Sequence, residues 1–331
     1  MTNLKGKNIL MFSPYGATKH YGEAIKNELL NRGANVYSYD ERPSQRALAK
    51  IIIRCFKKRI PQIFVQYVDA VIKKNRYVEF DYILICRGEA FTELAINHLK
   101  RTFNKAKFIL YLWDVLETTN VREIIHCFDK AMSFDSNDVA TNEKLEFRPT
   151  FFIPEYANLA VNTLLEYDII FIGTLHSNRH KIMKYFLDFF SARDMTFCVY
   201  LYVPGILFYI KNLIRKFPYI GVSKVKFKPI SLHDSVAMTV ESKAILDLSY
   251  VNQKGLTMRA YEALAARRKY ITNNQEIKKY DFYNENNICV IDISAPIVPQ
   301  EFINSPFVDI EERVMYKYSI QGFVDDLFWG I

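Results

Sequence analysis

Residues 252–266 read Asn-Gln-Lys-Gly-Leu-Thr-Met-Arg-Ala-Tyr-Glu-Ala-Leu-Ala-Ala, and they decide the interpretation of the whole chain. The apolar run at 244–250 just before them predicts a short buried strand. Gly255 frees the backbone and Thr257 is a favourable N-cap, so we expect a helix to begin after Thr257. A strand, a glycine-containing loop and a helix N-terminus form an anion site, because backbone N–H groups and the helix dipole point at one place.

Two charged side chains of this expected helix suit a nucleotide diphosphate. Arg259 lies in the first turn and offers a bidentate cation. Glu262 follows three residues later on the same face, where its carboxylate can accept hydrogen bonds from two adjacent sugar hydroxyls. The alternative is an ordinary ion pair between these two side chains on a solvated helix face.

The same stretch resembles a known family through the pattern Gly255-Leu256-Thr257-x-Arg259-x-x-Glu262-Ala-Leu-Ala, followed by 270–273, Tyr-Ile-Thr-Asn. It is similar to the donor-binding segment of GT-B glycosyltransferases, closest to the small bacterial enzymes of lipopolysaccharide and capsule assembly. The resemblance implies that Arg259 faces the donor phosphates and that Glu262 faces the ribose. Gly255, Leu256 and Thr257 are then donor-binding residues as well.

Two positions depart from the family pattern. Arg267 stands where many relatives have glycine after the Ala-Leu-Ala run. Lys254 occupies the place of the first glutamate of the retaining members, so the resemblance leaves inversion and retention of stereochemistry both open.

The length of 331 residues, half of them hydrophobic, favours two domains with sizeable cores. Both halves alternate strands and helices, and the resemblance implies an α/β protein of GT-B architecture, with two Rossmann-like domains whose parallel sheets face across a cleft. We expect an acceptor-side domain over 1–155, a donor domain over 156–308, and a helix over 309–331 that packs back on the first domain. The first loop has only Gly16 and lacks the G-x-G-x-x-G pattern, which excludes NAD binding.

The pattern predicts eleven strands and several helices. A long helix is expected from Ser44 to Asn75 with a break at Pro61, and a terminal helix over 309–329. The expected strands are 7–12, 34–39, 80–86, 106–113, 131–134, 167–172, 196–203, 225–227, 244–250, 269–273 and 288–291.

Two acids that follow buried strands of the first domain are candidates for the catalytic base. Glu89 comes after the tight turn Arg87-Gly88, and Asp114 ends the next strand along the chain. A base is needed to take the proton of the acceptor hydroxyl if the reaction inverts. Either carboxylate can instead cap the helix that follows it. We rank Glu89 first and Asp114 second.

A second loop resembles the opposing wall of the donor site in relatives. It contains Gly173, Thr174 and Arg179 in a Gly-x-x-x-x-x-Arg spacing, with His176 as a further phosphate contact. His176 and His180 stand four residues apart, but no glutamate lies between them, so a metal site is not expected. The resemblance implies a metal-independent enzyme without a cofactor, with the nucleotide sugar as substrate.

The net charge of +8 points to acidic partners. Segments 50–74 and 204–228 mix cations with large apolar residues, a composition that suits an anionic membrane surface, although solvated basic helix faces explain it equally well. No nucleic-acid-binding module is recognisable. The five scattered cysteines indicate reduced thiols, and no spanning helix or signal peptide is expected. These features predict a cytoplasmic protein, peripheral to the inner membrane.

Together these observations predict a glycosyltransferase that moves a sugar from a nucleotide-diphosphate sugar to a lipid-linked surface glycan, either O-antigen or capsule. A nucleotide-sugar epimerase of the same fold is the first alternative. A non-catalytic scaffold on the membrane surface is the second.

Overall fold

Two parallel sheets organise the chain, and each belongs to its own compact unit. The first unit consists of Met1–Thr150, Gln253–Gly255 and Tyr316–Ile331, and the second of Phe151–Asn252 and Leu256–Met315. The structure is a computed structural model. It describes residues 2–16, 18–46, 53, 57–157, 164–175, 179–203, 205, 225–250 and 252–331, without the side chains at 58 and 179–181.

The sheet of the first unit has six parallel strands in the order β2-β1-β3-β4-β5-β6. Its crossover reverses direction between β1 and β3, because β2 lies on one side of β1 and all later strands on the other. The elements are β1 (Asn8–Ser13), α1 (Lys19–Asn31), β2 (Asn35–Asp40), η1 (Lys57–Arg59), α3 (Pro61–Lys74), β3 (Tyr82–Cys86), α4 (Glu93–Thr102), β4 (Lys107–Leu112), α5 (Leu116–Thr119), η2 (Arg122–Cys127), β5 (Lys130–Ser133), α6 (Ser136–Ala140), β6 (Leu145–Phe147) and α14 (Ile320–Phe328).

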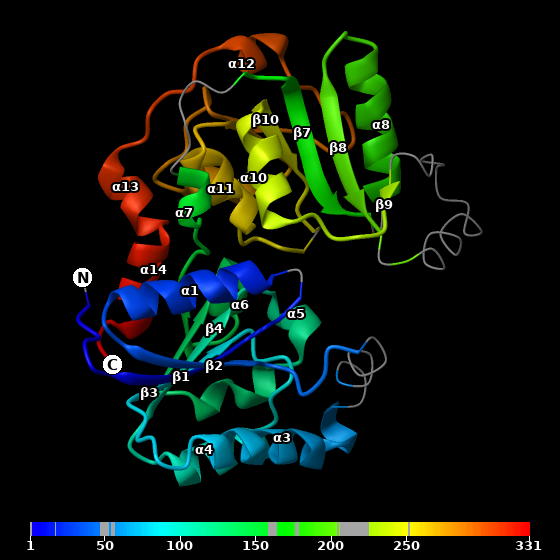
Figure 1. The fold of residues 1–331 in the computed structure, drawn as a ribbon. Coiled ribbons are helices and arrows are strands. Elements are labelled where there is room, and N and C mark those ends of the chain that lie inside the picture. The colour runs from blue at the N-terminus through cyan, green and yellow to red at the C-terminus, as the bar shows by residue number, and fades with distance from the viewer. Residues whose placement is uncertain are drawn as a thin grey trace. The chain divides into compact units, whose positions relative to one another are not determined.

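Helices cover both faces of this sheet, which is why its central strands are apolar on both sides. Figure 1 shows α1 and α14 on one face and α3 and α4 on the other. Phe64 of α3 and Ile96 of α4 pack with Leu10 and Ile83 in one core. On the opposite face, the ring of Tyr111 meets that of Phe323 of α14 edge-on, with 4.6 Å between centroids.

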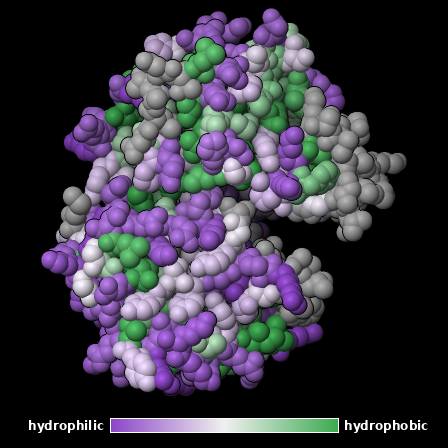
Figure 2. Space-filling model, in the orientation of Figure 1, coloured by the Kyte–Doolittle hydropathy of each residue, from purple (hydrophilic) through white to green (hydrophobic). Residues whose placement is uncertain are grey.

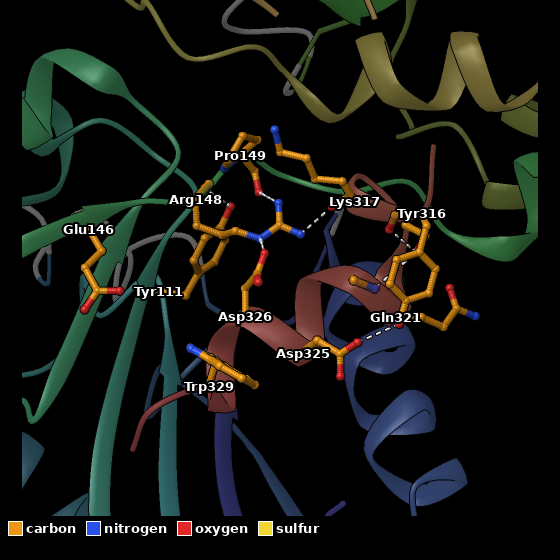
Figure 3. Close-up of polar contacts among 12 residues, drawn as sticks. Tyr111, Glu146, Arg148, Pro149, Tyr316, Lys317, Gln321, Asp325, Asp326 and Trp329 are labelled. Atoms are coloured by element: carbon orange, nitrogen blue, oxygen red, sulfur yellow. Dashed lines mark hydrogen bonds and ion pairs between the residues drawn. The ribbon is translucent and has the colours of Figure 1, made fainter. Parts of the chain in front are cut away.

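Within the first unit, a polar network connects the C-terminal residues 316–331 to the earlier part of the chain (Figure 3). The Arg148 guanidinium pairs with Asp326 at 2.7 Å and donates to the carbonyls of Pro149 and Lys317 at 3.0 and 2.6 Å. Asp325 accepts from the Thr2 amide and from Arg32, each at 2.6 Å. Burial alone would raise the pKa of Asp325, but hydrogen bonds from Tyr316, Thr2 and Arg32 outweigh it and lower the pKa to about 2.

The single terminal helix expected over 309–329 is wrong, since the segment forms two helices, α13 (Glu312–Lys317) and α14. Ser319 separates them and caps α14, because its hydroxyl accepts from the Gly322 amide at 3.1 Å. Gly322 permits this close turn, since a Cβ there would lie 2.3 Å from the carbonyl oxygen of Tyr316.

The second unit has six parallel strands in the order β12-β11-β10-β7-β8-β9, which is the doubly wound Rossmann order. The crossover changes direction between β7 and β10, and such switch points bind ligands at the carboxyl ends of the strands. The elements are α7 (Pro154–Ala157), β7 (Tyr167–Thr174), α8 (Arg179–Ser191), β8 (Phe197–Tyr202), β9 (Val225–Lys226), α10 (Leu232–Val240), β10 (Ser242–Asp247), α11 (Met258–Ala265), β11 (Lys269–Thr272), η4 (Gln275–Lys279), β12 (Ile288–Val290) and α12 (Gln300–Asn304), with most of α13.

All eleven predicted strands are present, with ends that differ by at most a few residues. The sequence missed β6, because this strand has three residues and two of them are exposed. The part of the expected helix that follows the break at Pro61 is α3, and Pro61 occupies its first turn, where proline causes no loss of a hydrogen bond. Most of the part before Pro61 lies outside the described residues. Figure 2 shows hydrophilic residues over most of the visible face of the first unit, with hydrophobic residues in separate groups.

Candidate functional site

The switch point of the second sheet lies where β7 ends at Thr174 and β10 ends at Asp247. Helix α11 begins close by in the chain, after Thr257, as the sequence predicts. Thr257 occupies the N-cap position, but its hydroxyl makes no capping hydrogen bond and donates instead to Asp247 Oδ2 at 2.5 Å. The phenol of Tyr270 donates to the same oxygen at 2.7 Å, so Asp247 fixes the entry to α11.

The glycine loop before α11 is held by another carboxylate. Asp135, which is 1% exposed, accepts hydrogen bonds from the amides of Lys254 and Gly255 at 2.8 and 2.9 Å. A Cβ at Gly255 would lie 2.6 Å from both the carbonyl oxygen and the ring of Phe134, so only glycine fits here without a shift of the backbone. Leu256 is buried directly after it.

Arg259 and Glu262 lie together inside the second unit. Arg259 Nη1 is 3.0 Å from Glu262 Oε2, and it donates to the hydroxyls of Ser235 and Tyr156 at 3.2 and 3.4 Å. The Arg259 side chain is 16% exposed and that of Glu262 is fully buried. This ion pair is therefore not on a solvated face. Arg259 can be reached by a ligand from its accessible side, whereas a ribose can reach Glu262 only if neighbouring side chains move.

The two candidate bases lie in a cluster of charged residues in the first unit. Arg87 connects them, with Nη2 at 2.9 Å from Glu89 and Nε at 2.8 Å from Asp114. Arg42 also pairs with Glu89, at 2.5 Å. Glu89 is 3% exposed, whereas the side chain of Asp114 is 43% exposed. Of these two carboxylates, Asp114 is thus the one that an acceptor hydroxyl can approach.

Glu41, which the sequence did not single out, is the most unusual member of this cluster. It is 1% exposed, and among the described residues neither carboxylate oxygen has a hydrogen-bond partner. Its nearest cations are Arg87 Nη1 at 3.7 Å and Arg42 Nε at 3.9 Å. Burial raises the pKa of Glu41 to about 8 against the lowering effect of these arginines, and Glu89 and Asp114 add to the rise.

The backbone also marks this cluster. Arg87 has φ 76° and Gly88 has φ 74°, so two successive residues adopt the left-handed conformation, which an arginine adopts only at a conformational cost. Lys57 stabilises this turn, because its ammonium group donates hydrogen bonds to the carbonyls of Glu89 and Asn120 at 3.0 and 2.9 Å.

Several predicted contacts lie outside the described residues. His176 is one of them, and the side chain of Arg179 is another, although Arg179 begins α8. Gly173 and Thr174 close β7 at the predicted edge of the sheet. Most of the basic segment 204–228 and part of segment 50–74 also fall outside the description.

One group of described residues has the composition of a metal site. Glu93, His126 and Cys127 offer ligand atoms within 4.8 Å of one another. His126 Nε2 is 3.4 Å from Glu93 and 3.5 Å from Cys127 Sγ. Burial raises the pKa of the Cys127 thiol, which opposes the thiolate that a metal needs. The four described cysteines are free, and within the described part of the chain we find no helix with the length and apolar character to cross a bilayer.

Comparisons with known proteins identify the fold. No protein-family model matches the sequence, and no curated protein does. Among solved structures, Anabaena HepE in complex with UDP and glucose is 12% identical, with 97% of this chain and 95% of that chain covered and a TM-score of 0.54. The catalytic domain of Arabidopsis starch synthase IV, bound to ADP and acarbose, is 9% identical over 98% and 97%, with a TM-score of 0.55. Methanocaldococcus UDP-GlcNAc 2-epimerase, in complex with UDP-GlcNAc and UDP, is 10% identical over 98% and 100%, with a TM-score of 0.53.

These likenesses confirm the predicted fold class: an α/β chain of GT-B type with two Rossmann-like domains. Both glycosyltransferases and epimerases have this fold, so the reaction has to be argued from the site.

Proposed function

We propose that this chain of GT-B fold is a glycosyltransferase that moves a sugar from a nucleotide-diphosphate sugar onto a surface-glycan acceptor, O-antigen or capsule. The observation that carries the proposal is the position of Arg259. It lies in the first turn of α11, follows the glycine loop, and retains an accessible edge near the switch point of a Rossmann-ordered sheet. A helix N-terminus reinforced by a guanidinium stabilises the departing diphosphate without a metal.

In this proposal the remaining donor contacts come from the two loops at the same edge. Gly255, Leu256 and Thr257 lead into α11, and Gly173 and Thr174 end β7, with His176 and Arg179 after them. Glu262 binds the ribose once the donor displaces its neighbours. The likeness in fold to structures that contain UDP or ADP supports a nucleotide at this edge.

For an inverting reaction we propose Asp114 as the base in preference to Glu89. Glu89 is buried between two guanidinium groups, which stabilise its ionised form and leave little access for an acceptor. Asp114 has one arginine partner and an exposed face. Arg87 orients it in the way that a base is commonly oriented by a third group.

The acceptor and the location are proposed from charge. An excess of +8 and the basic, apolar segments 50–74 and 204–228 suit an anionic inner-membrane surface at which a lipid-linked glycan is presented. The protein is then cytoplasmic and peripheral to that membrane.

Nucleotide binding by an Arg259→Lys variant tests the proposal. Lysine keeps a positive charge beside the buried Glu262, which would destabilise the fold if it were left without a counter-ion. Lysine lacks, however, the two parallel donors with which arginine binds a phosphate. After a thermal-shift screen of UDP-, GDP-, dTDP- and CMP-sugars, we expect the dissociation constant of the selected nucleotide to rise about tenfold by calorimetry. Arg313→Lys is the matched control in the same unit, because the Arg313 side chain is 83% exposed and pairs with the exposed Glu311. Equal affinity in both variants would contradict the proposal.

The likeness to UDP-GlcNAc 2-epimerase favours a second candidate, an epimerase of nucleotide sugars. Dependence on an acceptor separates the two reactions. An epimerase converts the donor alone, whereas a transferase releases the nucleoside diphosphate at an appreciable rate only when an acceptor glycan is added.

A further inference from the structure

A cavity of about 290 Å³ lies at the amino edge of the second sheet, at the opposite ends of β10 and β11 from the proposed donor site. Among the described residues, no acid lines it and four cations do: Lys243, Arg267, Arg268 and Lys269. Its size is at the lower limit of small-molecule pockets.

Two of these four positive charges have carboxylate partners. Lys243 pairs with Asp168 at 2.7 Å, and Arg267 pairs with Asp309. Arg268 and Lys269 form no ion pair with any carboxylate of the described residues. The cavity therefore has an excess of two positive charges.

Of these two uncompensated cations, Lys269 is buried and Arg268 is partly buried. Lys269 is 3% exposed, and its ammonium donates to the Asn286 carbonyl at 2.5 Å and to the Ser305 hydroxyl at 2.6 Å. Arg268 Nη2 donates to the Val240 carbonyl at 2.8 Å, while its buried Nε has no hydrogen-bond partner among the described residues. Burial lowers the pKa of Lys269, and burial together with Arg267 lowers the pKa of Arg268. A buried cation without a counter-ion is unfavourable, and an anion in the cavity relieves this cost.

Arg267 is held at the cavity in a conformation that glycine adopts more readily. Its φ is 55°, and the amides of Arg267 and Arg268 donate to the carbonyls of Leu264 and Ala263 at 3.0 and 2.8 Å. This is the Schellman arrangement that ends α11, in which the left-handed position is usually glycine. A side chain at this position carries a conformational cost, and the Arg267 guanidinium pairs with Asp309 and lies over the ring of Phe307, which lines the cavity.

We propose that this cavity binds a phosphate group. Arginine and lysine side chains around the partly buried hydroxyl of Ser305 offer several donors to one tetrahedral anion, a set that suits phosphate better than a planar carboxylate. Exposed apolar residues beside the cations, Leu165 among them at 44% exposure, fit the remainder of a phosphate ester. The phosphate belongs either to a free ion or to the headgroup of an anionic lipid. This site is separate from the proposed donor site and does not depend on it.

Calorimetry of the full chain with inorganic phosphate, together with sedimentation with phosphatidylglycerol and phosphatidylcholine vesicles, tests the proposal. Arg268→Gln removes one uncompensated charge. Arg193→Gln is the matched control, because the Arg193 guanidinium lies over the Phe189 ring and is not among the residues that line the cavity. We expect Arg268→Gln to weaken phosphate binding about tenfold if the ligand is a free ion. If the ligand is a headgroup, we expect it to reduce binding to phosphatidylglycerol alone.

Arg267→Gly supplies a second variant that cannot fail through strain, because glycine suits this backbone. We expect it to raise the melting temperature and to weaken the same binding. The proposal is overturned if neither ligand distinguishes Arg268→Gln from Arg193→Gln, or if phosphate binding is lost in Arg259→Lys and retained in Arg268→Gln. The second result would place the ion at the donor site. We expect UDP binding to be unchanged in Arg268→Gln, and this measurement distinguishes the two sites.

Discussion

Replacement of Glu41 by glutamine would remove a buried carboxyl whose folded-state pKa is far above its unfolded value. Its pKa rises from 4.5 to about 8, because burial outweighs the attraction of Arg42 and Arg87. The cluster contains three acids, Glu41, Glu89 and Asp114, around these two arginines. Glu41 is the acid of this cluster that has no hydrogen bond among the described residues, and its raised pKa favours the protonated form.

The sign of the effect follows from proton linkage. A raised pKa means that the folded state retains the proton after the unfolded chain has lost it, so the stability from this group is complete below pH 4.5 and is lost as the pH rises to about 8. At about 1.4 kcal/mol for each pH unit, the free energy of unfolding falls by at most roughly 5 kcal/mol over this window. The glutamine side chain in Glu41→Gln does not titrate, so the stability of the variant relative to the wild type should increase as the pH rises.

Urea unfolding at pH 5, 6, 7 and 8.5, followed by circular dichroism, measures this difference between variant and wild type. Glu79→Gln is the matched control, because it is the same substitution at a side chain that is 83% exposed. The reasoning is refuted if Glu41→Gln loses more stability at pH 8.5 than at pH 5. That result would mean that Glu41 is ionised and stabilises the two arginines as their counter-ion.

Two further predictions concern the carboxylates near the proposed reaction. Asp114→Asn should lower kcat by at least about a hundredfold with KM for the donor little changed. Glu89→Gln should mainly lower the melting temperature, because Glu89 forms ion pairs with both Arg42 and Arg87. The reverse pattern in steady-state kinetics and thermal unfolding would identify Glu89 as the base. Asp135→Ala should cost about 2–4 kcal/mol in equilibrium unfolding, because two loop amides and the Asn137 amide lose a charged acceptor, and the matched surface change Asp292→Ala should cost far less.

The hydrophobic pattern is sufficient to predict the strands, because each central strand is an apolar run bounded by polar turns. Strand β6 escapes this reasoning, since a three-residue edge strand is defined by its neighbour β5 and not by its own pattern. The sequence pattern predicts one helix in place of α13 and α14 for a similar reason, because the break at Ser319 depends on packing at Gly322.

The candidate site was predictable in position but not in its contacts. Residues 255–262 could be located because the loop and the helix are continuous in sequence. Asp135 and Glu41 could not be assigned their roles, because these depend on residues far away along the chain, such as Gly255 and Arg87. From the sequence, Arg267 could be identified only as a departure from glycine. The lack of counter-ions at the neighbouring cations can be recognised only when their burial and contacts are known.

The discontinuous first unit has a consequence for biosynthesis. Residues 316–331 leave the ribosome after the entire second unit, yet Phe323 and Phe328 cover Tyr111 and Tyr82 of the first sheet. Until these rings arrive, the part of the nascent sheet that they cover presents an apolar face to the solvent, where a chaperone can bind it. The second unit is therefore able to complete its fold before the first, although the first is translated earlier.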